Sequence, residues 1–297
     1  MIHLPATRRG FLSRLSQVTG AAGLLKFGDG TSDKPGAPAS GGVYDVTAFG
    51  ARGDGKTLDT AAINRAIAAA ADAGGGTVSF PAGTYLSYSI RLRSNVCLYF
   101  GHGCTLVAAA GAGYDAAESN QPWENYQDYG HNHWHNSLIW GEQLHDVSIS
   151  GPGRIWGKGL SRGEGPPPHA ETPGVGNKSL ALKNCRNVTL RDFAILHGGH
   201  FALLATGVDN LTIDNLQIDT NRDGMDIDCC RNVHIAGCSI NSPWDDAIVL
   251  KSSYALGFPR STEMVTISNC LVTGDYEEGS LLDGTFRRFD PARKLAP

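Results

Sequence analysis

The chain has 297 residues, of which 25 are basic and 29 acidic, giving a formal net charge of −4. This length allows one large domain or two ordinary ones, and no run of 18 or more apolar residues indicates a membrane span. The 38 glycines and 3 methionines favour many tight turns over helical packing.

Residues 1–39 have the features of an export signal. Arg8 and Arg9 in "TRRGFLS" match the twin-arginine pattern, and "APA" (37–39) offers small residues for cleavage. We therefore expect a periplasmic or secreted protein whose single domain is residues 40–297; an unstructured end with a chance Arg-Arg is the alternative. Removing the signal leaves a formal charge of −7, which attracts neither nucleic acid nor an anionic membrane.

The segment "TLDTAAINRAIAAAADAGGG" (57–76) predicts an amphipathic helix. Asp59 or Thr60 is its candidate N-cap, glycines end it, and the apolar face consists of Ile63, Ala66, Ile67 and Ala70. Such a helix could cover the open end of a stack of strands, where unpaired edges invite aggregation.

An aromatic segment, "QPWENYQDYGHNHWHNSLIW" (121–140), contains three alternating histidines. On a strand, His131, His133 and His135 would share one face, which is a geometry for zinc ligands. No carboxylate or cysteine completes a convincing site, so we predict no metal. Trp134 and His135 are instead candidates for a wall on which sugar rings stack, with ordinary packing as the alternative.

Four segments of the second half repeat one pattern: "NVTLRDFAI" (187–195), "NLTIDNLQI" (210–218), "NVHIAGCSI" (232–240) and "MVTISNCLV" (264–272). Alternation within each copy marks a short strand, and a period near 22 residues marks stacked coils. We predict an all-β fold, a right-handed parallel β-helix with an N-terminal capping helix. A leucine-rich repeat is the alternative, but no helix-forming half appears within each period.

The repeat also predicts which side chains stack. Val188, Leu211, Val233 and Val265 should be equivalent, and Phe193, Leu216, Cys238 and Cys270 should form one interior column. The last interval is 32 residues instead of 22 or 23, so about ten residues near 252–261 should loop out.

The seven cysteines (97, 104, 185, 229, 230, 238 and 270) match no zinc pattern. Most should be small buried apolar residues, with one or two disulfides possible in an oxidising compartment. The last residues, "TFRRFDPARKLAP", follow one more strand-like stretch (279–286) and show no amphipathic cap, which suggests a truncated C-terminus.

The same period brings acidic residues together. His200, Asp223 and Asp246 should fall in one column on successive coils, with Asp245 beside it. Three neighbouring carboxylates repel one another, so at least one should have a raised pKa. A protonated acid beside an ionised base suits hydrolysis of a glycosidic bond; a ladder of Asp residues that closes turns or binds Ca²⁺ is the alternative.

Two further acidic residues follow Asp223. Asp226 and Asp228 alternate with inward-facing residues, so we expect them to face solvent. Asp228 should lie directly below Lys251 and form an ion pair with it, worth roughly 0–1 kcal/mol if exposed.

The order "FGARGDGKTLDTAAINRAI", "NRDGMDID" and "SPWDDAIVLKS", over about residues 43–284, resembles the family 28 glycoside hydrolases. This family comprises polygalacturonases and rhamnogalacturonan hydrolases, which degrade pectin. The resemblance implies inverting hydrolysis of a pectic polysaccharide by a monomer without a cofactor. Asp245 would be the general acid, 6.5–9.5 Å from Asp223 and Asp246, which activate water.

The resemblance also implies substrate-binding residues. Asn221 would orient a carboxylate or the sugar, and His200 and Lys251 lie where they could contact substrate. Arg222 replaces the family's Thr; it could bind a substrate carboxylate bidentately or pair with a neighbouring Asp. The family's Gly-His-Gly has no His in the corresponding "EEGSLLDG" (277–284), and its Arg-Ile-Lys segment would lie beyond Pro297.

Two other functions remain open at this point. A β-helix lyase would use Ca²⁺ on an Asp cluster and an Arg or Lys base, although adjacent Asp245 and Asp246 fit hydrolysis better. A non-catalytic carbohydrate-binding β-helix, or an inactive hydrolase fragment, is the other alternative.

Overall fold

The computed structural model describes residues 42–288, except 120, 124, 125, 127–129, 164–171, 221, 279–281, 283 and 286. The predicted export signal (1–39), Asn221 and much of the strand-like stretch 279–286 therefore lie outside the described residues.

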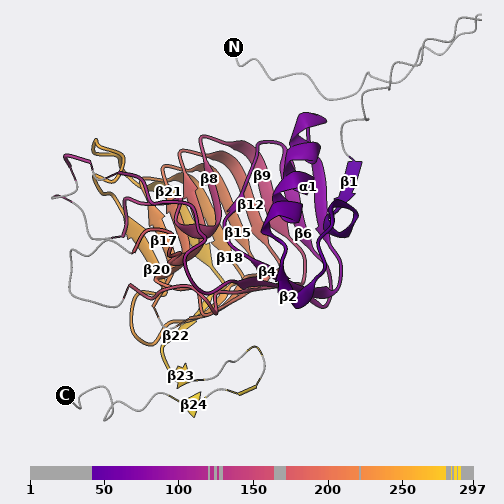
Figure 1. The fold of residues 1–297 in the computed structure, drawn as a ribbon. Coiled ribbons are helices and arrows are strands. Elements are labelled where there is room, and N and C mark those ends of the chain that lie inside the picture. The colour runs from indigo at the N-terminus through magenta and orange to yellow at the C-terminus, as the bar shows by residue number, and fades with distance from the viewer. Residues whose placement is uncertain are drawn as a thin grey trace, which may run out of the picture. The chain divides into compact units, whose positions relative to one another are not determined.

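Three sheets of parallel strands form the body of the molecule (Figure 1). Sheet A has the spatial order β1 (Gly42–Asp45), β3 (Gly76–Phe80), β6 (Val96–Phe100), β9 (His145–Ser150), β12 (Arg186–Arg191), β15 (Asp209–Asp214), β18 (Arg231–Ala236) and β21 (Glu263–Ser268). Sheet B contains β2 (Asp54–Leu58), β4 (Gly83–Ser87), β7 (Cys104–Ala108), β10 (Arg154–Trp156), β13 (Ala194–Leu196), β16 (Gln217–Asp219), β19 (Ser239–Asn241) and β22 (Leu271–Thr273). Sheet C contains β5 (Ile90–Arg91), β8 (Ser137–Glu142), β11 (Lys178–Lys183), β14 (Phe201–Thr206), β17 (Asp223–Asp228) and β20 (Ile248–Lys251).

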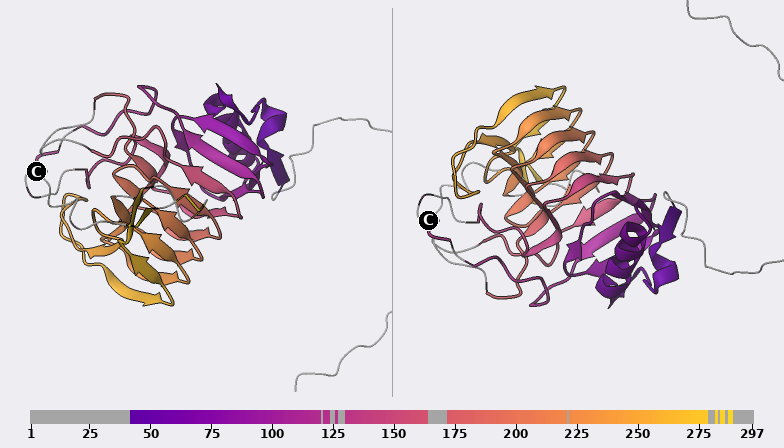
Figure 2. Two further views of the ribbon diagram at one scale, coloured as in Figure 1. Left: turned by 90° about the horizontal axis from the view of Figure 1, so that it is seen from below. Right: turned by 90° about the horizontal axis from the view of Figure 1, so that it is seen from above.

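The chain visits sheets C, A and B in turn, and each circuit pairs in parallel with the next, which makes a parallel β-helix. Figure 2 shows the strands stacked in chain order from indigo to yellow. The predicted column of Val188, Leu211, Val233 and Val265 is confirmed by the strand register. The second predicted column is also confirmed, because backbone bonds at this corner join Phe193 to Gln217, Leu216 to Ser239 and Cys238 to Leu271.

The predicted N-terminal helix is α1 (Thr60–Asp72), and its N-cap is Asp59. Both oxygens of the Asp59 side chain accept backbone N–H groups, from Arg52 and Gly53, rather than from the helix. The predicted apolar face is buried, with Ala62 in addition, and it packs against β1, β3, β5 and β6 at the indigo end of the stack in Figure 2. The helix thus covers the interior at that end, as expected. Beside it lies a short 3₁₀ helix, Val46–Phe49.

The corners of the coils differ in length. From β3 onward, two or three residues connect each strand of sheet A to the next strand of sheet B. The long connections enter or leave sheet C: residues 109–136 precede β8, residues 157–177 precede β11, and residues 252–262 follow β20. The last of these is the predicted insertion. Because α1 is the one α-helix among the described residues and each coil is made of strands, the leucine-rich repeat is excluded.

After the last coil, β23 (Tyr276–Glu278) and β24 (Arg287–Arg288) form a short antiparallel pair. No helix in the described part of the chain combines the length and apolar character needed to span a membrane. All seven cysteines are free in the structure; five are buried, and Cys97 and Cys270 are half-buried.

Candidate active site

Three aspartates meet where the chain passes from sheet B to sheet C. Asp223 begins β17, and Asp245 and Asp246 lie in the turn before β20. Because Met225 pairs with Ile248, Asp223 and Asp246 are equivalent positions on successive coils. One carboxylate oxygen of each aspartate lies within 4.8 Å of the others. The predicted convergence of the three carboxylates is therefore confirmed.

Gly224 allows this close approach of the two coils. Its N–H donates to the Asp246 carbonyl at 2.8 Å. A Cβ at this position would lie 2.4 Å from the Ala247 carbonyl oxygen and 2.8 Å from Ile240. Only glycine avoids these clashes. Gly224 therefore lets the coil that carries Asp223 lie close to the coil that carries Asp246.

The predicted raised pKa belongs to Asp223. Burial is its main cause, and repulsion from Asp226 and Asp245 adds to it. Arg222 and Lys251 offset part of the effect, leaving a pKa of about 8. At neutral pH this side chain therefore holds a proton.

Arg222 pairs with a neighbouring aspartate, which is one of its two expected roles. Its Nη2 lies 3.0 Å from Asp245 Oδ2. The same nitrogen lies 3.2 Å from His200 Nε2, and Nη1 donates to the Arg162 carbonyl at 3.2 Å. The guanidinium thus joins the aspartate cluster to the residues that precede β14 and β11.

His200 reaches the site, but the prediction that it shares a column with Asp223 is wrong. Phe201 is the residue that pairs with Asp223, because the interval here is 22 residues rather than 23. The imidazole stacks on Phe201 at 4.2 Å, and its Nε2 lies 3.8 Å from Asp223 Oδ2. Burial, followed by the charges of Arg222 and Lys178, lowers the pKa of His200 to about 2. The imidazole is therefore neutral and forms no ion pair with Asp223.

The prediction that Asp226 and Asp228 face solvent is wrong, because both are fully buried. Both side chains point away from the coil interior, but the long connections cover them. His131, from residues 109–136, lies 3.3 Å from Asp226. Ser253, from residues 252–262, donates its backbone N–H and its hydroxyl to Asp228.

Lys251 stands one coil from Asp228 in register, as predicted. Among the described residues, however, its ammonium pairs with Asp226 at 3.4 Å rather than with Asp228. It also lies 2.5 Å from His131 Nε2. The expected ion pair is thus replaced by a cluster of the buried Asp226 and His131 with the half-buried Lys251, while Ser253 binds Asp228.

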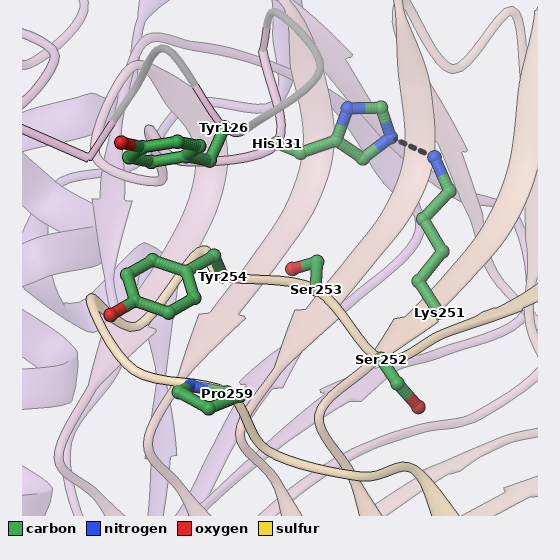
Figure 3. A pocket seen from close by; sticks show the side chains of 7 residues that line it. All are labelled: Tyr126, His131, Lys251, Ser252, Ser253, Tyr254 and Pro259. Atoms are coloured by element: carbon green, nitrogen blue, oxygen red, sulfur yellow. Dashed lines mark hydrogen bonds between the residues drawn. The ribbon is translucent and has the colours of Figure 1, made fainter.

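A pocket of about 620 Å³ opens beside this cluster, and its lining residues are Tyr126, His131, Lys251, Ser252, Ser253, Tyr254 and Pro259 (Figure 3). The two tyrosine rings are 6.1 Å apart and inclined at 64°. The ammonium of Lys251 and the ring of His131 point toward each other at one end of the pocket. Asp226 is three residues from Asp223, about 10 Å along the strand, so the pocket adjoins the aspartates on sheet C.

Trp134 and His135 do not form the expected wall. Trp134 is buried: its indole donates to Thr206 at 3.0 Å and lies under the ammonium of Lys183. The His135 ring packs against Trp140, with centroids 4.0 Å apart and planes inclined at 31°, and its Nε2 lies 2.9 Å from Glu142. The segment 131–136 is not a strand, so its histidines diverge, with His131 beside Asp226 and His135 beside Glu142.

Some residues of this region were not predicted from the sequence. Lys178 is buried and occupies the column of Phe201 and Asp223, where it contacts the amides of Asn136 and Asn177. The sequence predicts Asp226 in solvent and offers His131 only as part of a possible metal face. The alternation of β17 gave the correct direction of Asp226, but no local signal shows which distant loop covers it.

The cluster could hold one water molecule. Two hydrogen bonds of about 2.7 Å each let a water bridge carboxylate oxygens roughly 4.5 Å apart, and the three aspartate oxygens lie within 4.8 Å of one another. The oxygens are nearer than the 6.5–9.5 Å expected between acid and base in an inverting enzyme. A protonated Asp223 beside other carboxylates and a bridged water is an arrangement for acid–base chemistry.

Comparisons with known proteins agree with this fold. Residues 43–150 match the family model "Rhamnogalacturonase A/epimerase, pectate lyase-like", and residues 172–288 match "Right handed beta helix region". A probable polygalacturonase of Vitis vinifera is 26% identical over 254 residues, covering 75% of this chain and 48% of the relative. An alginate lyase of Azotobacter vinelandii is 64% identical over 42 residues, 14% of this chain and 5% of that one. The chain thus spans about half the length, or less, of these relatives.

Among solved structures, the family 28 exopolygalacturonase of Yersinia enterocolitica superposes with a TM-score of 0.60 at 21% identity, covering 79% of this chain and 51% of that one. The predicted right-handed parallel β-helix is confirmed, and it is the fold of family 28 polygalacturonases.

Proposed function

We propose that this chain, which shares the right-handed parallel β-helix of polygalacturonases, hydrolyses a pectic polysaccharide, either polygalacturonate or rhamnogalacturonan. The observation that carries the proposal is the convergence of Asp223, Asp245 and Asp246 within 4.8 Å, together with the raised pKa of Asp223. One group then protonates the leaving oxygen while another deprotonates water.

The roles divide between the three carboxylates. The resemblance assigns general acid to Asp245 and water activation to Asp223 with Asp246. The surroundings favour Asp223 as the proton holder, because it is buried whereas Asp245 pairs with Arg222. The kinetics of variants at Asp223 and Asp245 assign which of the two donates the proton.

The pocket beside Lys251 supports an anionic substrate. An ammonium at the end of a pocket of about 620 Å³ can attract a uronate carboxylate, and Tyr126 and Tyr254 supply aromatic surface for the ring. Lys251 and His131 both contact Asp226. Lys251 would therefore be one of several groups that determine which substrate the pocket binds. His200 and Arg222 would orient the aspartates, and Asn221 the sugar.

Cellular location and assembly complete the proposal. Arg8 and Arg9 support export by the twin-arginine route, to the periplasm or the exterior, where pectic polysaccharides are met. A monomer suffices for this function, because the three carboxylates come from one chain.

The first test measures reducing ends released from polygalacturonate and from rhamnogalacturonan oligosaccharides by the full chain, with ultraviolet absorbance followed in parallel. We expect new reducing ends without absorbance, because hydrolysis leaves no unsaturated sugar. Absorbance that grows with the reducing ends would replace the proposal by a lyase reaction. Binding of either polysaccharide by folded protein without turnover would make the chain a binding module.

A second test assigns the acid. Asp245→Asn and Asp223→Asn should each lower kcat on natural substrate by about 10²–10⁴-fold, while substrate binding remains. The variant that lacks the acid should recover on an aryl glycoside, whose leaving group needs no proton. Asp192→Asn, a partly exposed aspartate at the corner between sheets A and B, is the control and should keep full activity.

The anomeric form of the first product tests inversion. Space for one bridging water supports inversion, whereas the short spacing of the carboxylates is typical of retention. Proton NMR of an early reaction mixture should show the β-anomer from an α-linked substrate. Initial release of the α-anomer would make Asp223 or Asp246 a nucleophile instead.

A further inference from the structure

A second cluster of ligand-type side chains lies away from the aspartates. Glu118 and His135 belong to residues 109–136, and Glu142 ends β8. His135 Nε2 lies 2.9 Å from Glu142 Oε2 and 3.5 Å from Glu118 Oε1, and one atom of each residue lies within 4.8 Å of the others. β8 and β17 are three strands apart in sheet C, about 14 Å, so this cluster is separate from the proposed active site.

One oxygen of the cluster is unsatisfied. Glu118 Oε2 accepts the backbone N–H groups of Trp134 at 2.9 Å and His135 at 3.3 Å. Glu118 Oε1 is buried and has no hydrogen-bond partner among the described residues. Its 3.5 Å separation from His135 Nε2 is too long for a good hydrogen bond. A buried carboxylate oxygen without a partner is costly, and here it points at another ligand atom.

The two separations from His135 Nε2 to the carboxylate oxygens are those between ligands of one metal ion. Ligands about 2.1 Å from a metal lie roughly 3.4 Å apart in a tetrahedron and about 3.0 Å apart in an octahedron. The observed 2.9 and 3.5 Å bracket these values. A cation between the three atoms would satisfy the orphaned oxygen of Glu118 with little movement.

Neighbouring groups hold the three ligands in place. Trp140 stacks on the imidazole at 4.0 Å, and Lys183 binds the other oxygen of Glu142 at 3.1 Å. Such outer partners are what metal sites use to orient their ligands.

We propose that Glu118, His135 and Glu142 bind one divalent transition-metal ion, which fastens residues 109–136 to β8. An imidazole nitrogen with two carboxylates suits Zn²⁺, Co²⁺ or Mn²⁺ rather than Ca²⁺ or Mg²⁺, which prefer oxygen alone. The three side chains are 16–25% exposed, so water can complete the coordination. The same connection carries His131, so the ion would steady one wall of the pocket in Figure 3.

The test titrates Co²⁺ into metal-free full-length protein and follows the visible absorption of the bound ion, with thermal unfolding measured with and without Zn²⁺. We expect one saturable equivalent and a higher Tm with Zn²⁺. Glu118→Gln keeps an acceptor for the two backbone N–H groups and removes one charged ligand. It should weaken binding at least tenfold, and His135→Gln should abolish it.

Two control variants make the test specific. His145→Gln removes a histidine that, among the residues the structure describes, faces one carboxylate, Asp146, and this variant should bind Co²⁺ as the wild type does. Asp246→Asn, in the aspartate cluster, should also bind normally.

Three results would overturn the proposal: no saturable binding by the wild type, loss of binding in Asp246→Asn, or thiolate-to-cobalt absorption that marks a cysteine ligand. Unchanged affinity in a folded Glu118→Gln would overturn it even if His135→Gln failed to fold.

Discussion

Asp223 and Asp245 carry the same functional group, yet their surroundings give them different chemistry. The Asp223 side chain is 7% exposed and faces the carboxylates of Asp226 and Asp245. The Asp245 side chain is 36% exposed and pairs with Arg222. Burial disfavours the charged form of a carboxyl group, so the pKa of Asp223 is raised and its side chain holds a proton at neutral pH.

The raised pKa of Asp223 makes the stability of the fold depend on pH. Between about pH 4 and pH 8 the native state binds this proton more tightly than the unfolded state, so the free energy of unfolding falls as pH rises. Asn cannot ionise, so Asp223→Asn should gain stability relative to the wild type across this window, on the order of a few kcal/mol by pH 8. Urea unfolding at several pH values measures the difference.

Asp54→Asn is the control for that experiment. Hydrogen bonds from the backbone of Thr57 and Lys56 lower the pKa of Asp54 to about 2. Any stability that it contributes is therefore complete above its unfolded pKa and is lost only in acid. The difference between Asp54→Asn and the wild type should stay constant from pH 4 to pH 8. A constant difference for Asp223→Asn as well would contradict the raised pKa.

Arg222 should shape the pH dependence of activity. Its charge lowers the pKa of Asp223, so Arg222→Gln should raise that pKa further, by roughly one unit. Activity that needs the Asp223 proton would then persist to higher pH, and the alkaline limb of kcat/KM should move upward. Arg191→Gln, which removes an exposed pair with Asp192, should leave the limb in place. A downward movement in Arg222→Gln would speak against the assignment.

At the scale of an element, a ladder of polar side chains runs along the starts of four successive strands of sheet A, β9, β12, β15 and β18. Asn232 donates to Asn210, Asn210 to Asn187, and Asn187 to Asp146, with each donor 2.8–2.9 Å from its acceptor. All four have positive φ, which asparagine and aspartate tolerate better than other side chains. Met264 occupies the next position with φ 57° and cannot continue the ladder.

Met264→Asn should therefore stabilise the last coil. Asparagine relieves part of the cost of the left-handed conformation, about 1 kcal/mol, and its amide can reach Asn232. The urea midpoint should rise at an unchanged m-value. Met264→Leu keeps the strain and lacks the amide, so it should match the wild type. Equal midpoints for the Asn and Leu variants would show that the ladder contributes nothing here.

The elements were predictable where the sequence repeats and less so where it does not. The interior columns of sheets A and B follow from a period that the coil geometry enforces, so Val188 and Leu211 could be aligned from the sequence. The burial of Asp226 could not, because its cover comes from His131, 95 residues away. The same holds for Trp134, which is buried by Thr206 and Lys183 from later coils.

At the scale of the whole molecule, the interior contains cysteines as small apolar residues rather than as cross-links. Burial raises the pKa of Cys104 and of Cys230 to about 12 and that of Cys238 to about 11. These thiols are therefore protonated and unreactive at neutral pH. The disulfides left open by the sequence are absent from the described chain.

A thiol titration tests this interior. Without reductant, the native protein should react with Ellman's reagent mainly at the half-buried Cys97 and Cys270, and the unfolded protein should yield seven thiols. A deficit of two thiols would indicate a cross-link, for which Cys238 and Cys270, neighbours on successive coils, are candidates. Prior reduction should leave Tm unchanged.

The connections between strands differ in how much their length can change. An insertion between sheets A and B would interrupt a turn of two or three residues that recurs from coil to coil. An insertion beside sheet C only lengthens a connection such as 109–136 or 252–262, which already lies outside the stack. Changes in chain length are thus admitted on the face that bears the aspartates and the pocket. Mutation and recombination could change the surface that faces a ligand while the stacked β-coils beneath it stay the same.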